Sequence, residues 1–216
     1  FIYQPFAYYN GEDSFTYELI DGEGATSQAT VNITVEAVNN APELVFPTQR
    51  STPEDSSLVI LGISVSDQDI DDSDMEINLS VENGFLTLGA IDGLSFSLGD
   101  GDSDATLIFS GTRANIANAI SPITFIPVEH FNGDVLLQVE INDLGGNGIG
   151  GPLTDSGQLQ ISVVAVNDNP TAIDDEAETD EDNILIGNLL ANDIDLDSSN
   201  GTSPPSHYTL SVNTSP

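Results

Sequence analysis

Val38-Asn39-Asn40-Ala41-Pro42 and Val166-Asn167-Asp168-Asn169-Pro170 are two versions of one short linker, each placed after a strand-like apolar run. Each linker is followed by an acidic step, Thr52-Pro53-Glu54-Asp55 after the first and Thr179-Asp180-Glu181-Asp182 after the second. An alternating run of carboxylates comes next, Asp67-x-Asp69-x-Asp71 and Asp193-x-Asp195-x-Asp197. Features that recur in the same order indicate tandem copies of one module.

The spacing of these repeats divides the 216 residues into one complete module and two partial modules. A shift of 122 residues places Gly11 on Gly133 and Asp21 on Asp143, whereas the linkers match at a shift of 128. The second copy therefore has six additional residues, around positions 145–152. We expect residues 1–42 to form the C-terminal half of a module, 43–170 a complete module and 171–216 the N-terminal half of the next.

Short β-strands dominate the predicted structure of the central module. Each is rich in Val, Ile, Leu or Phe and is bounded by Gly, Asp, Asn or Ser clusters. The stretch from Leu159 to Val163 alternates between apolar and polar residues, and residues 112–120 have helical spacing for one or two turns. We predict strands at residues 57–66, 77–88, 94–98, 105–110, 123–126, 135–142 and 158–166. Seven short strands predict an all-β fold, namely an antiparallel β-sandwich.

The charge balance restricts the partners of the chain. There are 36 Asp and Glu residues against two basic residues, Arg50 and Arg113, and the net charge is −34. Nucleic-acid binding depends on Lys and Arg, so we exclude DNA and RNA as partners. No apolar stretch is long enough for membrane insertion, and the absence of cysteine excludes disulfides. Metal cations are the natural counter-ions of such a chain.

The parity of the strands predicts that acidic residues gather at both ends of the central module. We call residues 38–42 the upper linker and residues 166–170 the lower linker. If the first strand runs down from the upper linker, the Glu54-Asp55 step lies at the bottom of the module and the next strand returns to the top. The strand before the lower linker must also run up. The upper joint then contains Asp67, Asp69 and Asp143, which face Asn39 and Asn40. The lower joint contains Glu54, Asn167, Asp168 and Asn169, which face Asp193 and Asp195.

Oxygen ligands gathered in this way predict a calcium site at each joint, because Ca²⁺ binds about six to eight oxygen atoms in flexible geometry. Without a cation, the carboxylates repel one another. A single Asp-x-Asp is more often a solvated turn, so the prediction depends on the convergence of several elements at one junction. The upper joint has one charge less, because Asn40 stands where the lower joint has Asp168.

Other polar residues predict no site. The acidic stretch from Asp100 to Asp104 is interpreted as a solvated turn. His130 and His207 have no partners at metal-ligand spacing, so we predict that they are surface or edge residues. No Ser/His or Cys/His pairing is evident, and the carboxylates gather at module ends rather than in one pocket. We therefore predict that the chain is not an enzyme.

The motifs resemble a known family as a set. Ala165-Val166-Asn167-Asp168-Asn169-Pro170 is similar to the interdomain linker of cadherins. Tyr9-Asn10-Gly11-Glu12-Asp13-Ser14-Phe15-Thr16-Tyr17 and Gly187-Asn188-Leu189-Leu190-Ala191-Asn192-Asp193-x-Asp195 resemble bacterial cadherin-like tandem repeats of large secreted adhesins of the RTX type. The resemblance covers essentially the whole chain. It implies tandem cadherin- or immunoglobulin-like β-sandwich modules that are secreted or on the cell surface and that depend on calcium.

The resemblance also assigns roles to particular residues. Glu54 corresponds to the basal glutamate of the family, residues 167–169 to its linker and Asp143 to its single top aspartate. Asp67 with Asp69, and Asp193 with Asp195, correspond to its top Asp-x-Asp pair. The Asp-Arg-Glu element of animal cadherins has no clear counterpart in this sequence, which leaves the number of ions in each joint open.

Three functions are consistent with the sequence. The first is a calcium-stiffened extracellular stalk or adhesin segment, whose partners are neighbouring repeats and a cell-surface protein or polysaccharide. The second is a filament subunit, because the two partial modules could complete each other head to tail between copies. The third is a polysaccharide-binding module, with Tyr8, Tyr9 and Tyr208 as the aromatic residues available for a sugar platform.

Overall fold

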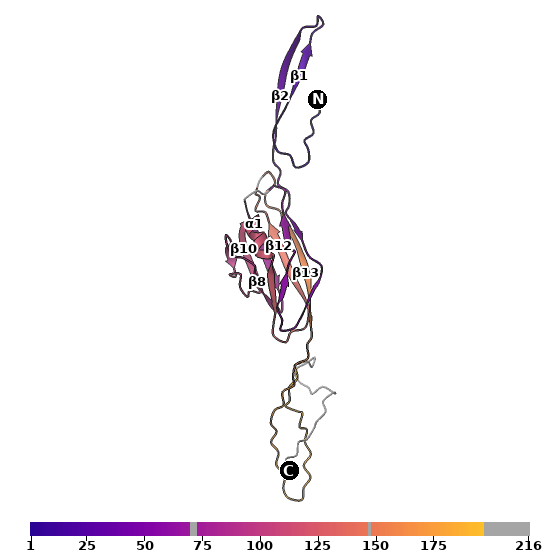
Figure 1. The fold of residues 1–216 in the computed structure, drawn as a ribbon, viewed down its shortest axis with the longest axis vertical. Coiled ribbons are helices and arrows are strands. Elements are labelled where there is room, and N and C mark those ends of the chain that lie inside the picture. Colours follow the sequence, from indigo (N-terminus) through magenta and orange to yellow (C-terminus); the bar gives the residue numbers. More distant parts are fainter. Residues whose placement is uncertain (70–72, 147, 197–216) are drawn as a thin grey trace.

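A hairpin, a central sandwich and an extended C-terminal segment follow one another along the molecule in a computed structural model (Figure 1). The structure describes residues 1–69, 73–146 and 148–196. The predictions for Asp71, Asp197, His207 and Tyr208 fall outside these residues. No helix among the described residues has the length and apolar character needed to cross a membrane.

Two packed layers of strands form the central sandwich. The larger sheet has six strands in the order β4 (Arg50–Pro53), β13 (Thr154–Val164), β12 (Gly133–Asn142), β7 (Asp74–Val81), β10 (Thr106–Thr112) and β9 (Ser95–Leu98). The second layer contains β5 (Leu58–Ile60), β11 (Ile123–Pro127) and β8 (Gly84–Leu88), together with the pair β3 (Glu43–Val45) and β6 (Ser64–Ser66). All pairings are antiparallel except that of β13 with β4. The predicted antiparallel β-sandwich is confirmed.

The core lies between the layers because the strands alternate apolar and polar residues. In β12, Val135, Leu137, Val139 and Ile141 are buried, and the residues between them are exposed. The predicted alternation in β13 is also confirmed, since Leu159, Ile161 and Val163 are buried. The helix α1 (Arg113–Ile120) covers one end of the core, and its buried residues are Ile116, Ala119 and Ile120.

Two predicted strands are divided in the structure. The predicted strand 57–66 is split into β5 and β6, which belong to different sheets, and Gly62 between them has a φ of +92°. The predicted strand 77–88 is split into β7 and β8 by a turn in which Asn83 has a φ of +55°. Continuous apolar character does not reveal such turns, because Gly and Asn adopt left-handed conformations inside an otherwise strand-like sequence. The first strand that the parity argument assumed after the upper linker, without bounds, is present as the two short strands β3 and β4.

The N-terminal hairpin repeats the pairing of the last two strands of the sandwich. β1 (Gly11–Ile20) pairs with β2 (Thr26–Val35) in a register that matches Gly11 with Val35 and Ile20 with Thr26. β12 and β13 match Gly133 with Val163 and Asn142 with Thr154. The two registers are therefore identical when β1 is shifted by 122 residues and β2 by 128. The same local pattern of residues specifies the same hairpin twice.

Replacement of a buried leucine in β12 will destabilise the sandwich. Leu137 is fully buried, and Leu137→Ala should lower the free energy of unfolding by about 2–5 kcal/mol through lost burial and a residual cavity. Leu136 is 41% exposed on the opposite face of the same strand, so Leu136→Ala should stay within about 0.5 kcal/mol of the parent. Urea denaturation measures both values. Equal effects of the two substitutions would contradict the assignment of the two faces.

Candidate metal sites at the two ends of the sandwich

At the upper end, the linker residue Asn39 is held by the connection between β12 and β13. Its Nδ2 donates to Asp143 Oδ2 at 2.7 Å and to the backbone oxygen of Gly151 at 2.9 Å. Its backbone N–H donates to the carbonyl of Ile149, and the N–H of Ile149 donates to the carbonyl of Ala37. The linker is therefore bound through both its side chain and its backbone.

The next linker residue, Asn40, is held by the predicted Asp-x-Asp loop. Its side-chain amide donates to both carboxylate oxygens of Asp69, at 2.8 and 3.0 Å, and its backbone N–H donates to Asp69 Oδ2. The N–H of Asp69 donates to Asp67 Oδ1 at 2.9 Å. Consecutive linker residues thus bind Asp143 and Asp69, and the five residues predicted for the upper joint lie together.

Asp143 also fixes the connection in which it lies. It is fully buried, and its Oδ1 accepts from the N–H groups of Gly145 and Leu153, both at 2.8 Å. Its counterpart Asp21 binds the shorter connection of the first hairpin in the same way, through the N–H groups of Glu23 and Ala25. In both copies the aspartate holds together the connection between the two strands of the hairpin. Asp143 differs in that its second oxygen, Oδ2, accepts a hydrogen bond from the linker residue Asn39.

The six additional residues of the second copy provide the contact with the linker. Val38 and Ile149 form a parallel β-bridge, so the longer connection adds a short strand-like pairing beside the chain. The sequence located the six additional residues around positions 145–152. It did not predict that Ile149 and Gly151 contact the linker. The insertion in the repeat alignment was the signal that could have identified them.

Negative charge at the upper end has few positive partners. Asp67 and Asp143 are buried, and no ion pair between described residues involves Arg50 or Arg113. Asn39 Oδ1 is buried and accepts no hydrogen bond from any described residue. A buried oxygen without a donor, beside carboxylates, is a suitable ligand for a hard cation such as Ca²⁺. The residues of the upper joint therefore fit the predicted ion.

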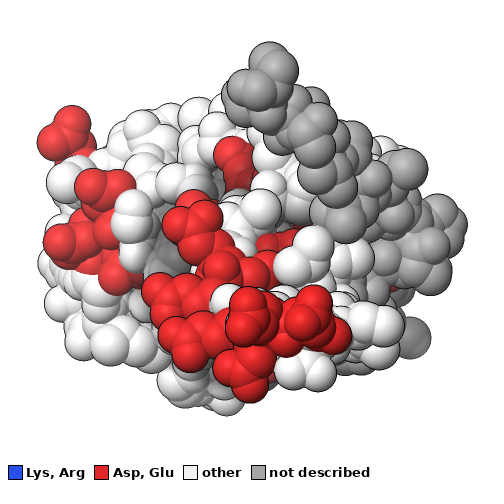
Figure 2. Space-filling model, turned by 90° about the horizontal axis from the view of Figure 1, so that it is seen from below, with Lys and Arg blue, Asp and Glu red and all other residues white. Residues whose placement is uncertain are grey.

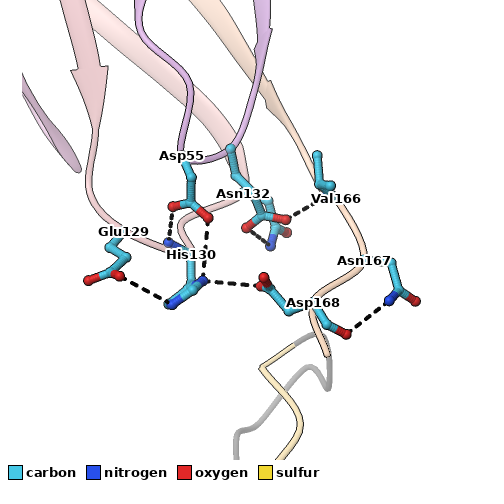
Figure 3. Close-up of polar contacts among 8 residues, drawn as sticks. Asp55, Glu129, His130, Asn132, Val166, Asn167 and Asp168 are labelled. Carbon is cyan, nitrogen blue, oxygen red and sulfur yellow. Dashed lines mark hydrogen bonds and ion pairs between the residues drawn. The ribbon is translucent and has the colours of Figure 1, made fainter. Parts of the chain in front are cut away.

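At the lower end, Glu54 binds the start of the second linker. Its side chain is buried, and its carboxylate accepts from the N–H of Val166 at 2.5 Å and from Asn132 Nδ2 at 3.4 Å. Its own N–H donates to the carbonyl of Val164 at 2.9 Å. These contacts attach the chain that leaves β13 to the base of the sandwich (Figure 3).

His130 is half-exposed, as expected for a surface or edge residue, but the prediction that it has no partners at metal-ligand spacing is wrong. Its Nδ1 lies 3.1 Å from Asp168 Oδ2 and 3.4 Å from Asp55 Oδ2, and its Nε2 lies 3.6 Å from Glu129 Oε1. Figure 3 shows these side chains converging below the sandwich. The prediction missed the cluster because Asp55, His130 and Asp168 are far apart in the sequence and lie in two loops and the linker, whose conformation brings them together.

The remaining predicted ligands lie in the linker and in the segment below it. Asn167 and Asn169 are exposed, and Asn167 Nδ2 donates to the carbonyl of Asp168 at 2.9 Å. Asp193 Oδ1 accepts from the N–H of Ile173 at 2.9 Å, and Asp195 is half-buried beside the bridge between Thr171 and Ile194. Seen from this end, the described surface shows many Asp and Glu side chains and no Lys or Arg (Figure 2).

Two other sets of predicted residues can be placed. In the acidic turn, Asp104 Oδ2 accepts from the N–H groups of Asp100 and Gly101, which makes this carboxylate a structural part of the turn. Tyr8 is 68% exposed, and the hydroxyl group of Tyr9 donates a hydrogen bond to the backbone carbonyl of Glu12. Tyr8 and Tyr9 line a surface hollow that also borders Asn40 and Asp69.

Comparisons with known proteins gave one family match and several similar solved structures. The family described as Bacterial Ig domain matches residues 1–34. No curated protein matches the sequence. Similar solved structures include human mucin-like protocadherin EC1-2, with 21% identity, a TM-score of 0.34 and coverage of 71% of this chain and 69% of that one.

Two further structures show weaker likeness. The ASH/PapD-like domain of human CEP192 has 14% identity and a TM-score of 0.30, and the match covers 59% of this chain and 88% of that one. An endo-fucoidan hydrolase of glycoside hydrolase family 107 has 17% identity and a TM-score of 0.28, and the match covers 74% of this chain and 21% of that one. The family match covers residues 1–34, which include β1 and most of β2, and together with the sheet topology it is consistent with an immunoglobulin-like β-sandwich.

A side chain at Gly148 will detach the connection from the upper linker. Gly148 has a φ of +123°, and a Cβ there would lie 2.7 Å from the backbone nitrogen of Asn39. Gly148→Ala should accelerate hydrogen exchange of the Asn39 and Ile149 amides about 3–10-fold, because the hydrogen bonds from Asn39 N–H to the Ile149 carbonyl and from Ile149 N–H to the Ala37 carbonyl open. Gly151→Ala is the matched control, since Gly151 also has a positive φ but open space around its Cβ position. Unchanged exchange in Gly148→Ala would show that the linker is held without this contact.

Proposed function

We propose that this chain is a calcium-stiffened segment of an extracellular array of sandwich modules, with a structural or adhesive role. The observation that supports this proposal most directly is the arrangement at the upper joint. Asn39 and Asn40 bind Asp143 and Asp69, and Asn39 Oδ1 remains buried without a hydrogen-bond donor among the described residues. A cation coordinated by that oxygen and by the neighbouring carboxylates would connect the linker to the top of the sandwich.

The electrostatics of the chain support a cation at each joint. Two carboxylates about 4 Å apart repel by about 1 kcal/mol in bulk water, and by more where water is partly excluded. The chain has two arginines and no lysine for 36 carboxylates, so its own side chains cannot neutralise the joints. Divalent cations from the medium can do so, and extracellular calcium modules typically bind at about 10⁻⁴–10⁻³ M.

The residues of this chain have distinct roles in the proposed joints. Asp143 and Glu54 bind the two linkers directly through hydrogen bonds, and the other ligands supply oxygen atoms around them. Calcium, when bound, supplies positive charge that ties the linker to carboxylates of both neighbouring modules. We assign Asn39, Asn40, Asp67, Asp69 and Asp143 to the upper site, and Glu54, Asn167, Asp168, Asn169, Asp193 and Asp195 to the lower site.

Stiffening at the joints suits a structural rather than a catalytic role. The carboxylates of Asp69, Asp143 and Glu54 lie at the ends of the sandwich, where they hold the two linkers. A stalk needs each joint to resist bending, and a cation that binds both sides of a joint removes its freedom to open. Such a segment would hold a binding region away from a cell or join cells through neighbouring repeats.

The head-to-tail filament is less consistent with the structure. The N-terminal hairpin corresponds to β12 and β13, and the C-terminal segment repeats the motifs found between the first linker and the Asp-x-Asp loop. Among the described residues, no counterpart of β9, β10 or α1 occurs in residues 1–42 or 171–196. In the sandwich these elements contribute five fully buried residues to the core: Leu107, Phe109, Ile116, Ala119 and Ile120. A module assembled from these described residues alone would lack this part of its core.

Calcium will raise the melting temperature of the chain. With Ca²⁺ at about 10 mM and a dissociation constant of about 10⁻⁴–10⁻³ M, each site should contribute about 1.4–2.7 kcal/mol. A protein of this size melts about 2–4 °C higher for each kcal/mol. A thermal melt followed by circular dichroism, with Mg²⁺ as a second cation, measures the effect.

Two variants locate that effect. Asp69→Asn keeps an oxygen that can accept from Asn40 but removes one charge, so it should reduce the calcium-dependent rise. Asp102→Asn is the control, because Asp102 is an exposed residue of the acidic turn, away from both joints. If chelation leaves the melting temperature of the parent unchanged, the acidic joints are solvated loops and the proposal is wrong.

A further inference from the structure

We propose that the lower end carries a second kind of metal site, in which His130, Asp55 and Asp168 bind a divalent transition metal of the zinc class. Each of these residues offers one ligand atom, and the three atoms lie within 4.8 Å of one another. Among the described residues, this is the one cluster in which three His, Asp or Glu ligand atoms come so close. The inference does not rest on the calcium function.

The distances within the cluster suit a small cation. Zinc binds nitrogen and oxygen ligands at about 2.0–2.2 Å, so tetrahedral angles place neighbouring ligand atoms about 3.3–3.6 Å apart. His130 Nδ1 lies 3.1 Å from Asp168 Oδ2 and 3.4 Å from Asp55 Oδ2. Small side-chain movements would give both pairs the required separation, with water completing the coordination.

Glu129 provides the outer partner that a metal-binding histidine usually has. Such a histidine donates its other ring N–H to a carboxylate or a carbonyl, which sets the tautomer and the orientation of the ring. His130 Nε2 lies 3.6 Å from Glu129 Oε1, on the side opposite the two carboxylates that face Nδ1 (Figure 3). Nδ1 is then the nitrogen available to the metal.

The backbone holds two of the ligands in place before any metal binds. The N–H of His130 donates to Asp55 Oδ1 at 2.7 Å, which leaves Asp55 Oδ2 directed at the imidazole. Asp55 and His130 both have left-handed backbone conformations, with φ values of 57° and 58°. The turn between β4 and β5 and the loop between β11 and β12 are therefore joined at this point.

The nitrogen ligand distinguishes this cluster from the calcium joints. Calcium is a hard cation that prefers oxygen, whereas imidazole suits zinc and other transition metals. No histidine is among the residues of the upper joint. The metal would connect two loops of the sandwich to Asp168 of the lower linker. It would therefore attach this linker to the base of the module, beside the contact made by Glu54.

The test is a titration of the whole chain with Zn²⁺, first after chelation of calcium and then with millimolar Ca²⁺. The second titration shows how far Ca²⁺ competes, because Asp168 is also a ligand of the proposed lower calcium site. Isothermal calorimetry should show tight binding of Zn²⁺, and Co²⁺ should give an absorption spectrum altered by removal of the nitrogen ligand. His130→Asn and Asp55→Asn should each weaken Zn²⁺ binding at least tenfold. Asparagine tolerates left-handed backbone conformations, so both variants should stay folded.

Three controls make the result decisive. His207→Asn replaces the other histidine of the chain and should leave Zn²⁺ affinity unchanged. Glu129→Gln should weaken binding about 10–100-fold if Glu129 is the outer partner. Asp69→Asn should affect the calcium response alone, so failure of this proposal is distinguishable from failure of the calcium proposal.

Two outcomes would overturn the inference. Equal Zn²⁺ affinity in the parent and in His130→Asn would mean that zinc binds to carboxylates elsewhere on the surface. Absence of Zn²⁺ binding by the parent would mean that the contacts of His130 with Asp55 and Asp168 join the loops to the linker without a metal. Circular dichroism of each variant verifies that a loss of binding does not reflect unfolding.

Discussion

Negative charge that must be neutralised with almost no positive side chains is the constraint on which this structure depends. Burial of a carboxylate is unfavourable unless donors or cations compensate it. Asp143 and Glu54 meet this requirement with N–H groups, and in both cases one of the donors belongs to a linker. The compensation of buried charge and the attachment of neighbouring parts of the chain are therefore the same interaction.

The two ends of the sandwich meet the constraint with different chemistry. At the upper end, Asn39 and Asn40 supply amide donors to Asp143 and Asp69, and the surrounding ligands are oxygen atoms. At the lower end, an imidazole stands between carboxylates from a loop and from the linker. The upper end thus offers oxygen ligands alone, whereas the lower end offers an imidazole nitrogen in addition to carboxylates.

Much of the site could be predicted from strand parity. In an antiparallel sandwich, the direction of each strand determines which loops share an end, so Asp67, Asp69 and Asp143 could be placed beside Asn39 and Asn40 without coordinates. The cluster around His130 could not be predicted in this way. It depends on side-chain direction at two left-handed residues, which parity does not specify.

The sequence by itself determined the class of the fold, the order of the repeated motifs and the hairpin that recurs with the same register, because local alternation and turn residues encode these features. The tertiary structure alone decided which polar groups meet. The division of two predicted strands, the contact of Ile149 with the upper linker and the approach of Asp55, His130 and Asp168 all bring together residues far apart in the chain. Such contacts depend on the packing of both sheets and on loop conformation, which no local pattern contains.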